Sequence, residues 1–179
     1  MNSNRNRTSI LILIFCVLAF ITSTEAAPSD APELPAICAA LKGDIDRAPI
    51  FHVYAVGVQI YRWDGASWML TGPDAKLYAE ESYDGLVGKH YAGPTWESVS
   101  GSKVVARKVA ECTPDTSAVA WLLLERTSST GPGIFGKVAY IQRVNTTGGL
   151  KPTIAGSTVG EEQRVPYTAE YYFYKGSAE

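Results

Sequence analysis

The segment IFHVYAVGVQIYRW, residues 50–63, is the clearest strand in the chain, and it indicates the class of fold. Its side chains alternate between two faces, as a β-strand requires. One face carries Val56, Val58 and Ile60, and the other carries Gly57, Gln59 and Tyr61. Asp64-Gly65 follows directly, and this dipeptide favours a tight hairpin turn. The segment therefore predicts a strand that turns back into an antiparallel sheet.

Further short apolar or alternating segments follow, with turn-forming residues between most of them. They cover residues 67–71, 75–80, 86–91, 96–99, 103–109, 118–125, 134–144 and 165–174. No helix alternates with these strands, which excludes a doubly wound α/β fold. We expect an all-β, single-domain antiparallel β-sandwich or small β-barrel of about nine strands. A short helical turn is expected near the N-terminus, over residues 36–42.

The N-terminus has the order of a secretory signal peptide. Two arginines precede an apolar run of 12 residues, and small or polar residues follow this run. The run is shorter than the roughly 18–20 residues of a membrane-spanning helix, although a retained anchor is the alternative. We expect a signal peptide over residues 1–26, an extended leader over 27–36 and one β domain over 37–179. The protein is then secreted, extracellular or at the cell surface, with no membrane span after cleavage.

The charged and metal-binding residues limit the classes of partner. Removal of residues 1–26 leaves 14 basic and 17 acidic side chains, so nothing resembles the basic stripe of a nucleic-acid-binding protein. Two cysteines remain, Cys38 and Cys112, and an oxidising compartment favours a disulfide between them over two free thiols. With the two histidines His52 and His90 they are too few for a zinc site. The sequence therefore predicts no metal and no cofactor.

Six segments, taken in order, carry a resemblance to a known family. They are VGVQIYRW (56–63), GPDAKLY (72–78), GKHYAGPTWESVSGSKVV (88–105), AWLLLE (120–125), VAYIQRVNTTGG (138–149) and VPYTAEYYFY (165–174). Together they resemble the secreted bacterial and fungal family known as domain of unknown function 3455, over about residues 34–174. The resemblance implies a single secreted domain with no settled activity, substrate or cofactor, and it assigns no catalytic residue.

The chain departs from the family pattern at two positions. Bacterial relatives often have cysteine at the position of Trp63 and in a Gly-Cys-Asp near residues 155–157, where this chain has Ser157. The resemblance implies that one disulfide is lost and that Cys38–Cys112 is a substitute. Fungal members are sometimes labelled malate dehydrogenase, but this chain has no Gly-x-Gly-x-x-Gly after a strand and no βαβ alternation.

The segment GKHYAGPTWES is the densest run of chemically capable side chains. His90 titrates near neutrality in water, and Glu97 is a possible partner across a Gly-Pro turn. Trp96 offers a platform for a sugar or an aromatic ligand, beside Tyr91. The alternative is a Tyr-Trp core contact beside a turn, with His90 and Glu97 on the solvated face.

The segment IQRVNTTGG is a second candidate, with donors on Gln142, Arg143 and Thr147. Arg143 can bind a carboxylate or phosphate through two parallel hydrogen bonds. The alternative is a capped turn, with Arg143 paired to an acid such as Glu97 or Glu170.

The segment YTAEYYFY is a third candidate, because Tyr172 and Tyr174 beside Glu170 can bind carbohydrate. The alternative is aromatic cross-strand packing, which stabilises a sheet by up to about 1 kcal/mol per pair. Asn145-Thr146-Thr147 is also an N-glycosylation sequon, so a glycan on Asn145 is expected in a eukaryotic secretory pathway.

We expect a binding module for carbohydrate or another small extracellular ligand. Its residues are His90, Tyr91, Trp96, Glu97, Gln142, Arg143, Thr147 and Glu170. A hydrolase or lyase that uses His90 with Glu97 or Arg143 is the second hypothesis, and a structural surface protein is the third. No motif places a nucleophile or a pair of carboxylates, so the sequence assigns no catalytic residue.

Overall fold

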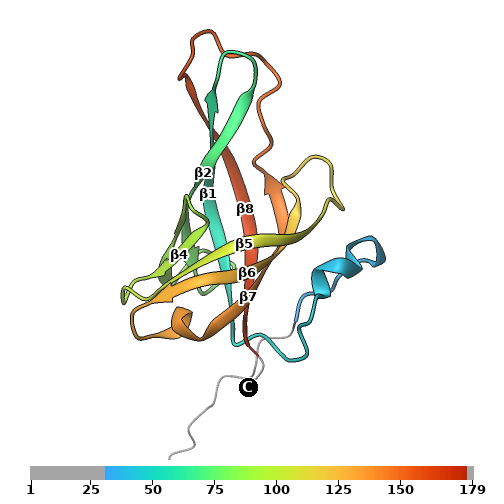
Figure 1. The fold of residues 1–179 in the computed structure, drawn as a ribbon, viewed down its shortest axis with the longest axis vertical. Coiled ribbons are helices and arrows are strands. Elements are labelled where there is room, and N and C mark those ends of the chain that lie inside the picture. The colour runs from blue at the N-terminus through green and yellow to red at the C-terminus, as the bar shows by residue number, and fades with distance from the viewer. Residues whose placement is uncertain (1–30, 177–179) are drawn as a thin grey trace, which may run out of the picture.

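The computed structural model describes residues 31–176, in which the strands form one closed antiparallel barrel (Figure 1). The elements in chain order are η1 (Ala36–Lys42), β1 (Phe51–Trp63), β2 (Trp68–Tyr78), β3 (Leu86–Tyr91), β4 (Thr95–Ser98), β5 (Lys103–Cys112), β6 (Trp121–Thr130), η2 (Ile134–Lys137), β7 (Val138–Gly148) and β8 (Glu162–Lys175). The predicted all-β antiparallel fold is confirmed, and so is the helical turn over 36–42, which is a 3₁₀ helix.

The predicted signal peptide, residues 1–26, and the first part of the leader lie outside the described residues. Within residues 31–176, no helix is long and apolar enough to cross a membrane.

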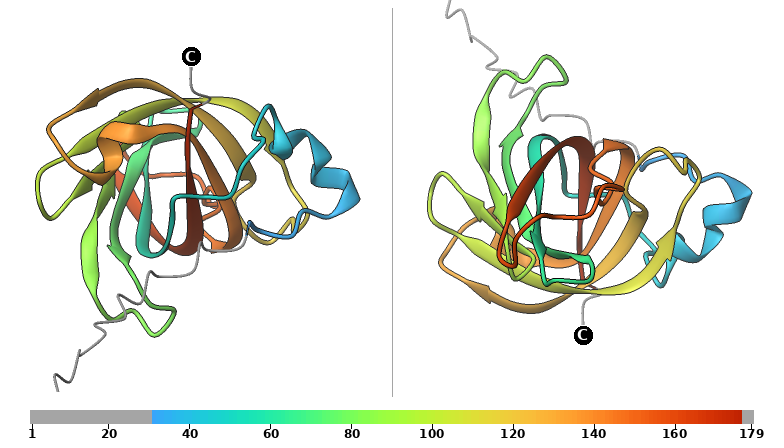
Figure 2. Two further views of the ribbon diagram at one scale, coloured as in Figure 1. Left: turned by 90° about the horizontal axis from the view of Figure 1, so that it is seen from below. Right: turned by 90° about the horizontal axis from the view of Figure 1, so that it is seen from above.

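Each strand pairs with its neighbour in sequence, and β1 and β8 close the sheet (Figure 2). Their pairing runs from Phe51 opposite Phe173 to Arg62 opposite Glu162. The two strands are the longest described, with 13 and 14 residues. The sequence left open whether the fold is a β-sandwich or a small β-barrel. The long pairing of β1 with β8 closes the sheet, so the fold is a barrel.

Two of the nine predicted strands are one strand in the structure. The segments predicted separately at 67–71 and 75–80 form β2, and Gly72-Pro73-Asp74 continues the strand instead of turning it. The irregularity is a bulge, since Ile60 pairs with Gly72 and Tyr61 pairs with Leu70. Pro73 pairs with Gln59 of β1 but lies beyond the paired part of β3, in a part of the strand with a neighbour on one side only, where proline is tolerated.

The barrel interior is filled mainly by aromatic and small side chains. The inner face of β8 supplies much of this core, because Tyr167, Ala169, Tyr171 and Phe173 are all buried in it. Trp96 on β4 meets Tyr171 edge-on, with 5.5 Å between the ring centres. Such tilted contacts are favourable for aromatic rings, and they fix the positions of the interior side chains.

The N-terminal segment lies outside the barrel in both views of Figure 2, and its Leu34 and Ile45 pack against an outer cluster that includes residues of β8. The predicted disulfide between Cys38 and Cys112 is confirmed, and it ties η1 to β5. Beneath this segment, Tyr172 and Tyr174 are buried in an outer aromatic cluster. These tyrosines therefore pack in the protein, as the alternative of aromatic packing expects, and they present no exposed stripe to a carbohydrate.

Trp63 and Ser157 stand at the two positions where relatives often have cysteine, and the structure places Trp63 next to the segment that contains Ser157. A Cβ added to Gly156, the neighbour of Ser157, would stand 2.5 Å from Cγ of Trp63. The Trp63 side chain therefore fills the space next to the second position.

Gly57 marks the closest approach of β1 to β2. A Cβ at this position would lie 2.2 Å from the Asp74 carbonyl oxygen and 2.5 Å from Cα of Ala75. Both are backbone atoms, so no side-chain rotation relieves the contact. We expect Gly57→Ala to lower the free energy of unfolding by about 1–3 kcal/mol, as overpacking does. Urea unfolding measures this loss, and an unchanged midpoint would contradict the strand spacing.

Candidate functional site

A cavity of about 580 Å³ runs from the buried interior of the barrel to its surface. Its buried lining includes Gln59, His90, Trp96 and Tyr171, each no more than 3% exposed. Its outer part is lined by exposed residues such as Leu70 and Lys151. This volume lies within the roughly 300–1,000 Å³ that small-molecule sites occupy.

Arg143 on β7 reaches this cavity from the inner face of the sheet. Its Nε and Nη2 donate to the Ala120 carbonyl oxygen, at 3.1 and 2.6 Å. Among the described residues, no carboxylate forms an ion pair with Arg143. The alternative that Arg143 pairs with Glu97 or Glu170 is therefore not what the structure shows. Its charge remains available inside the barrel.

His90 on β3 is a neutral wall of the cavity. Its Nδ1 lies 2.9 Å from the Thr95 carbonyl oxygen, which can only accept, so Nδ1 carries the proton and Nε2 is an acceptor. The ring stacks on Trp96 with 4.1 Å between centres. Burial lowers the pKa of His90 to about 3, and the charge of Arg143 acts in the same direction. His90 therefore carries no charge at neutral pH.

Three further side chains of the lining have buried polar atoms without a partner. They are Nε2 of Gln59, Nε1 of Trp96 and the hydroxyl of Tyr171. The indole and amide nitrogens are donors, and the hydroxyl can donate. An unpaired buried donor costs about 1–3 kcal/mol relative to a paired one. The side chains that carry these atoms line the cavity, although the atoms themselves are buried behind its surface.

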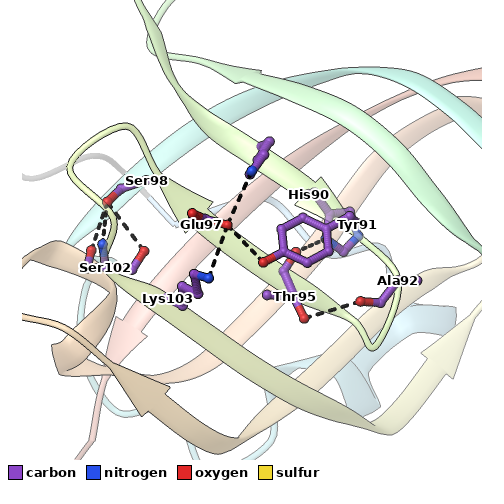
Figure 3. A network of polar contacts seen from close by, with 9 residues as sticks. His90, Tyr91, Ala92, Thr95, Glu97, Ser98, Ser102 and Lys103 are labelled. Carbon is purple, nitrogen blue, oxygen red and sulfur yellow. Dashed lines mark hydrogen bonds and ion pairs between the residues drawn. The ribbon is translucent and has the colours of Figure 1, made fainter.

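Glu97 and Tyr91 lie on the outer face of the barrel (Figure 3). The Tyr91 hydroxyl donates to Glu97 at 2.8 Å, while Lys89 and Lys103 lie 3.4 and 3.5 Å from the same carboxylate. The Tyr91 hydrogen bond and both lysines hold the pKa of Glu97 below its usual value. Exposed ion pairs of this kind contribute little to stability.

The predicted pair of His90 and Glu97 is wrong. His90 pairs with Trp96 across the hairpin, whereas Glu97 pairs with Lys89. Because side chains alternate along a strand, His90 points into the barrel and Glu97 points out of it. The alternative that placed both residues on the solvated face holds only for Glu97, since His90 is buried.

Gln142 also lies outside the cavity, on the outer face of β7. Its Nε2 donates to the Leu41 carbonyl oxygen at 2.7 Å, and its Oε1 accepts from the Tyr174 hydroxyl. The side chain thus joins η1 to the sheet beneath it. One of its two amide N–H groups and its amide oxygen are used inside the protein, and it does not line the cavity, so the structure gives it a structural role.

Glu170 and Thr147 belong to another outer surface, on β7 and β8. Glu170 lies 2.9 Å from Nε2 of His52, and it accepts hydrogen bonds from Asn145 and Tyr172 at 3.0 Å each. The His52 contact is the main reason why the pKa of Glu170 is lowered. Thr147 bonds to the hydroxyl of Thr168. Neither residue lines the cavity.

The sequon residue Asn145 is exposed on the same surface. Its glycosylation stays a prediction.

Of the eight predicted binding residues, the structure brings His90, Trp96 and Arg143 to one cavity. Sequence reasoning missed Gln59 and Tyr171 as members of the site. Gln59 shares a face of β1 with Gly57 and Tyr61. A polar amide between these residues, on a face that can point into the fold, is the sequence feature that could have identified it. Within residues 31–176, no cluster of histidine, cysteine and acidic side chains could hold a metal ion.

Comparison with known proteins gives one match. A family model described as a protein of unknown function (DUF3455) matches residues 46–175, which cover all eight described strands. No curated protein and no solved structure matches the chain. The matched residues are most of the chain and include the whole cavity lining. The chain therefore belongs to the DUF3455 family, whose function is unknown.

Proposed function

We propose that this protein is an extracellular binding module whose barrel holds a small organic ligand. The observation that carries the proposal is the cavity, because it combines an arginine without a carboxylate partner and several unpaired polar atoms in one partly apolar space. Folded proteins rarely leave such groups buried and unpaired. The apparent signal peptide of residues 1–26 supports secretion.

Binding inside the barrel is favoured over binding to a flat aromatic surface. Trp96 is 1% exposed and His90 covers one face of its ring, so it offers no platform to a polysaccharide chain. Tyr172 and Tyr174 are likewise buried. A single small molecule in the cavity can reach Trp96, whereas an extended polymer cannot.

Catalysis by His90 with Arg143 is the second candidate, because both residues line the cavity. A general base works best when its pKa lies near the working pH. The pKa of His90 is about 3, so its neutral form has little affinity for a proton. Hydrogen bonding by Nε2 to a ligand needs no such affinity, and this favours the binding hypothesis.

Thermal unfolding of the purified protein against small organic acids, amides, alcohols and sugars tests the proposal. A ligand raises the unfolding midpoint only if it binds the folded state. We expect one chemical class to raise the midpoint. Leu122→Trp should abolish this shift, since Leu122 lines the cavity and the larger side chain fills it.

Val99→Trp is the matched control, because Val99 is 71% exposed in the turn after β4. It should preserve the ligand shift. A shift that survives in Leu122→Trp would place the binding site elsewhere. No shift with any compound would count against ligand binding by the barrel.

A further inference from the structure

We infer that the ligand is an organic carboxylate with an apolar body, and that Arg143 binds its carboxylate group. This inference rests on the proposed function and names the class of ligand for the same cavity.

The free hydrogen-bonding capacity of Arg143 carries the first step. A guanidinium has five N–H donors. The Ala120 carbonyl oxygen accepts from Nε–H and from one N–H of Nη2. Both N–H groups of Nη1 and one of Nη2 then make no hydrogen bond to a described acceptor. One N–H of each of these two nitrogens points outward along the edge between them. That edge matches the two oxygens of a carboxylate, with which arginine forms two parallel hydrogen bonds.

The charges around the cavity carry the second step. At the outer end, Lys108 and Glu111 pair with each other, which leaves Lys151 as a further cation of the lining. His90 is neutral, so among the described residues Arg143 supplies the fixed charge of the inner lining. One such charge matches one carboxylate group.

The remaining polar atoms agree with an anionic ligand. Nε1 of Trp96 and Nε2 of Gln59 are donors without an acceptor, and both residues line the same space as Arg143. A cation would leave these donors unpaired and would also face the charge of Arg143. An anion instead offers acceptor atoms and is attracted by the charge of Arg143.

The apolar side chains of the cavity lining indicate the chemical nature of the rest of the ligand. Leucine side chains line the cavity from the inner face of β6 to the surface: Leu70, Leu122, Leu124 and Leu150. They offer no hydrogen bonds, and they bury the apolar part of a ligand favourably. The arrangement therefore fits a carboxylate attached to a hydrocarbon or aromatic group better than it fits a highly hydroxylated molecule.

Two probes that differ only in charge test this inference on the native protein. They are 2-naphthoate and its neutral amide, 2-naphthamide, each titrated calorimetrically at pH 7. A hydrogen bond to a charged group contributes more than one to a neutral group. We expect naphthoate to bind at least roughly tenfold more tightly than naphthamide, which corresponds to one charge-assisted contact.

Arg143→Met then removes the guanidinium while keeping much of the side-chain volume. We expect this variant to bind naphthoate no more tightly than naphthamide, with the naphthamide affinity unchanged. Arg107→Met is the control, because Arg107 is exposed on β5 and pairs with Glu125. It should retain the preference of the native protein for naphthoate.

The outcomes separate this inference from the proposed function. Equal affinity of the native protein for both probes, or an unchanged preference in folded Arg143→Met, would overturn the carboxylate assignment and leave a binding cavity. Failure of both probes to bind the native protein would overturn this inference, whereas the thermal-unfolding panel of acids, amides, alcohols and sugars decides the proposed function separately. The comparison on the native protein needs no variant, so it decides even if Arg143→Met does not fold.

Discussion

Acidification from pH 6.5 to about 3.5 is expected to destabilise the protein by about 4 kcal/mol through His90 alone. The pKa of His90 is about 3 in the folded protein, because the ring is buried, whereas its ordinary value is 6.5. Below pH 6.5 the unfolded chain therefore takes up a proton that the folded protein does not. The contribution of His90 is fully present above pH 6.5 and is lost at about 1–2 kcal/mol per pH unit as the pH falls.

His90→Phe isolates this effect from the titration of carboxylates. Phenylalanine keeps a ring stacked on Trp96 but cannot take up a proton. Urea unfolding at several pH values between 7 and 4 should show a steeper loss of stability for the native protein than for His90→Phe. The His90 ring resonances should also remain those of the neutral form at pH 5. Parallel pH profiles, or a ring that titrates near pH 6.5, would show that His90 is not buried in the barrel.

Loss of the disulfide is the second large effect. Cys38 and Cys112 are 74 positions apart, and closing so long a loop stabilises a folded chain by roughly 4 kcal/mol in the chain-entropy account. Cys38→Ser with Cys112→Ser should lower the free energy of unfolding by about this amount. The segment around η1 would also be held only by its contacts with the sheet, such as that between Leu41 and Gln142.

The cavity should survive this change. The disulfide and η1 lie on the outer face of the barrel, whereas the ligand site lies inside it. The double serine variant should therefore keep its ligand-induced rise in unfolding midpoint at a temperature where it is folded. A loss of stability below about 1 kcal/mol, together with two free thiols in the native protein, would contradict the bond.

The sequence predicts the strands well because alternation and turn residues are local signals. Asp64-Gly65 separates two strands as expected, and so does the interval between the predicted segments 96–99 and 103–109. Closure of the sheet is not a local property, since it depends on the pairing of Phe51 with Phe173 at the two ends of the fold. The Gly72-Pro73 turn was predicted wrongly because proline is also tolerated where a strand lacks a second neighbour.

The same reasoning explains the mixed outcome for the site. His90, Trp96 and Arg143 were found because the sequence concentrates capable side chains near turns. Glu97 was wrongly joined to His90, although strand alternation places neighbouring positions on opposite faces. Tyr171 was not singled out, because its place opposite Arg143 depends on the pairing of β7 with β8, which no local pattern in the sequence reveals.

The most direct test of the binding cavity is the indole N–H signal of Trp96 in a ¹⁵N-resolved NMR spectrum during titration with 2-naphthoate. The chain has four tryptophans, and the other three, Trp63, Trp68 and Trp121, do not line the cavity. Trp96→Phe assigns the signal. Our account predicts that the Trp96 signal shifts with saturation, while the other three stay in place. An unmoved Trp96 signal at saturating probe, or a shift confined to the other three, would contradict it.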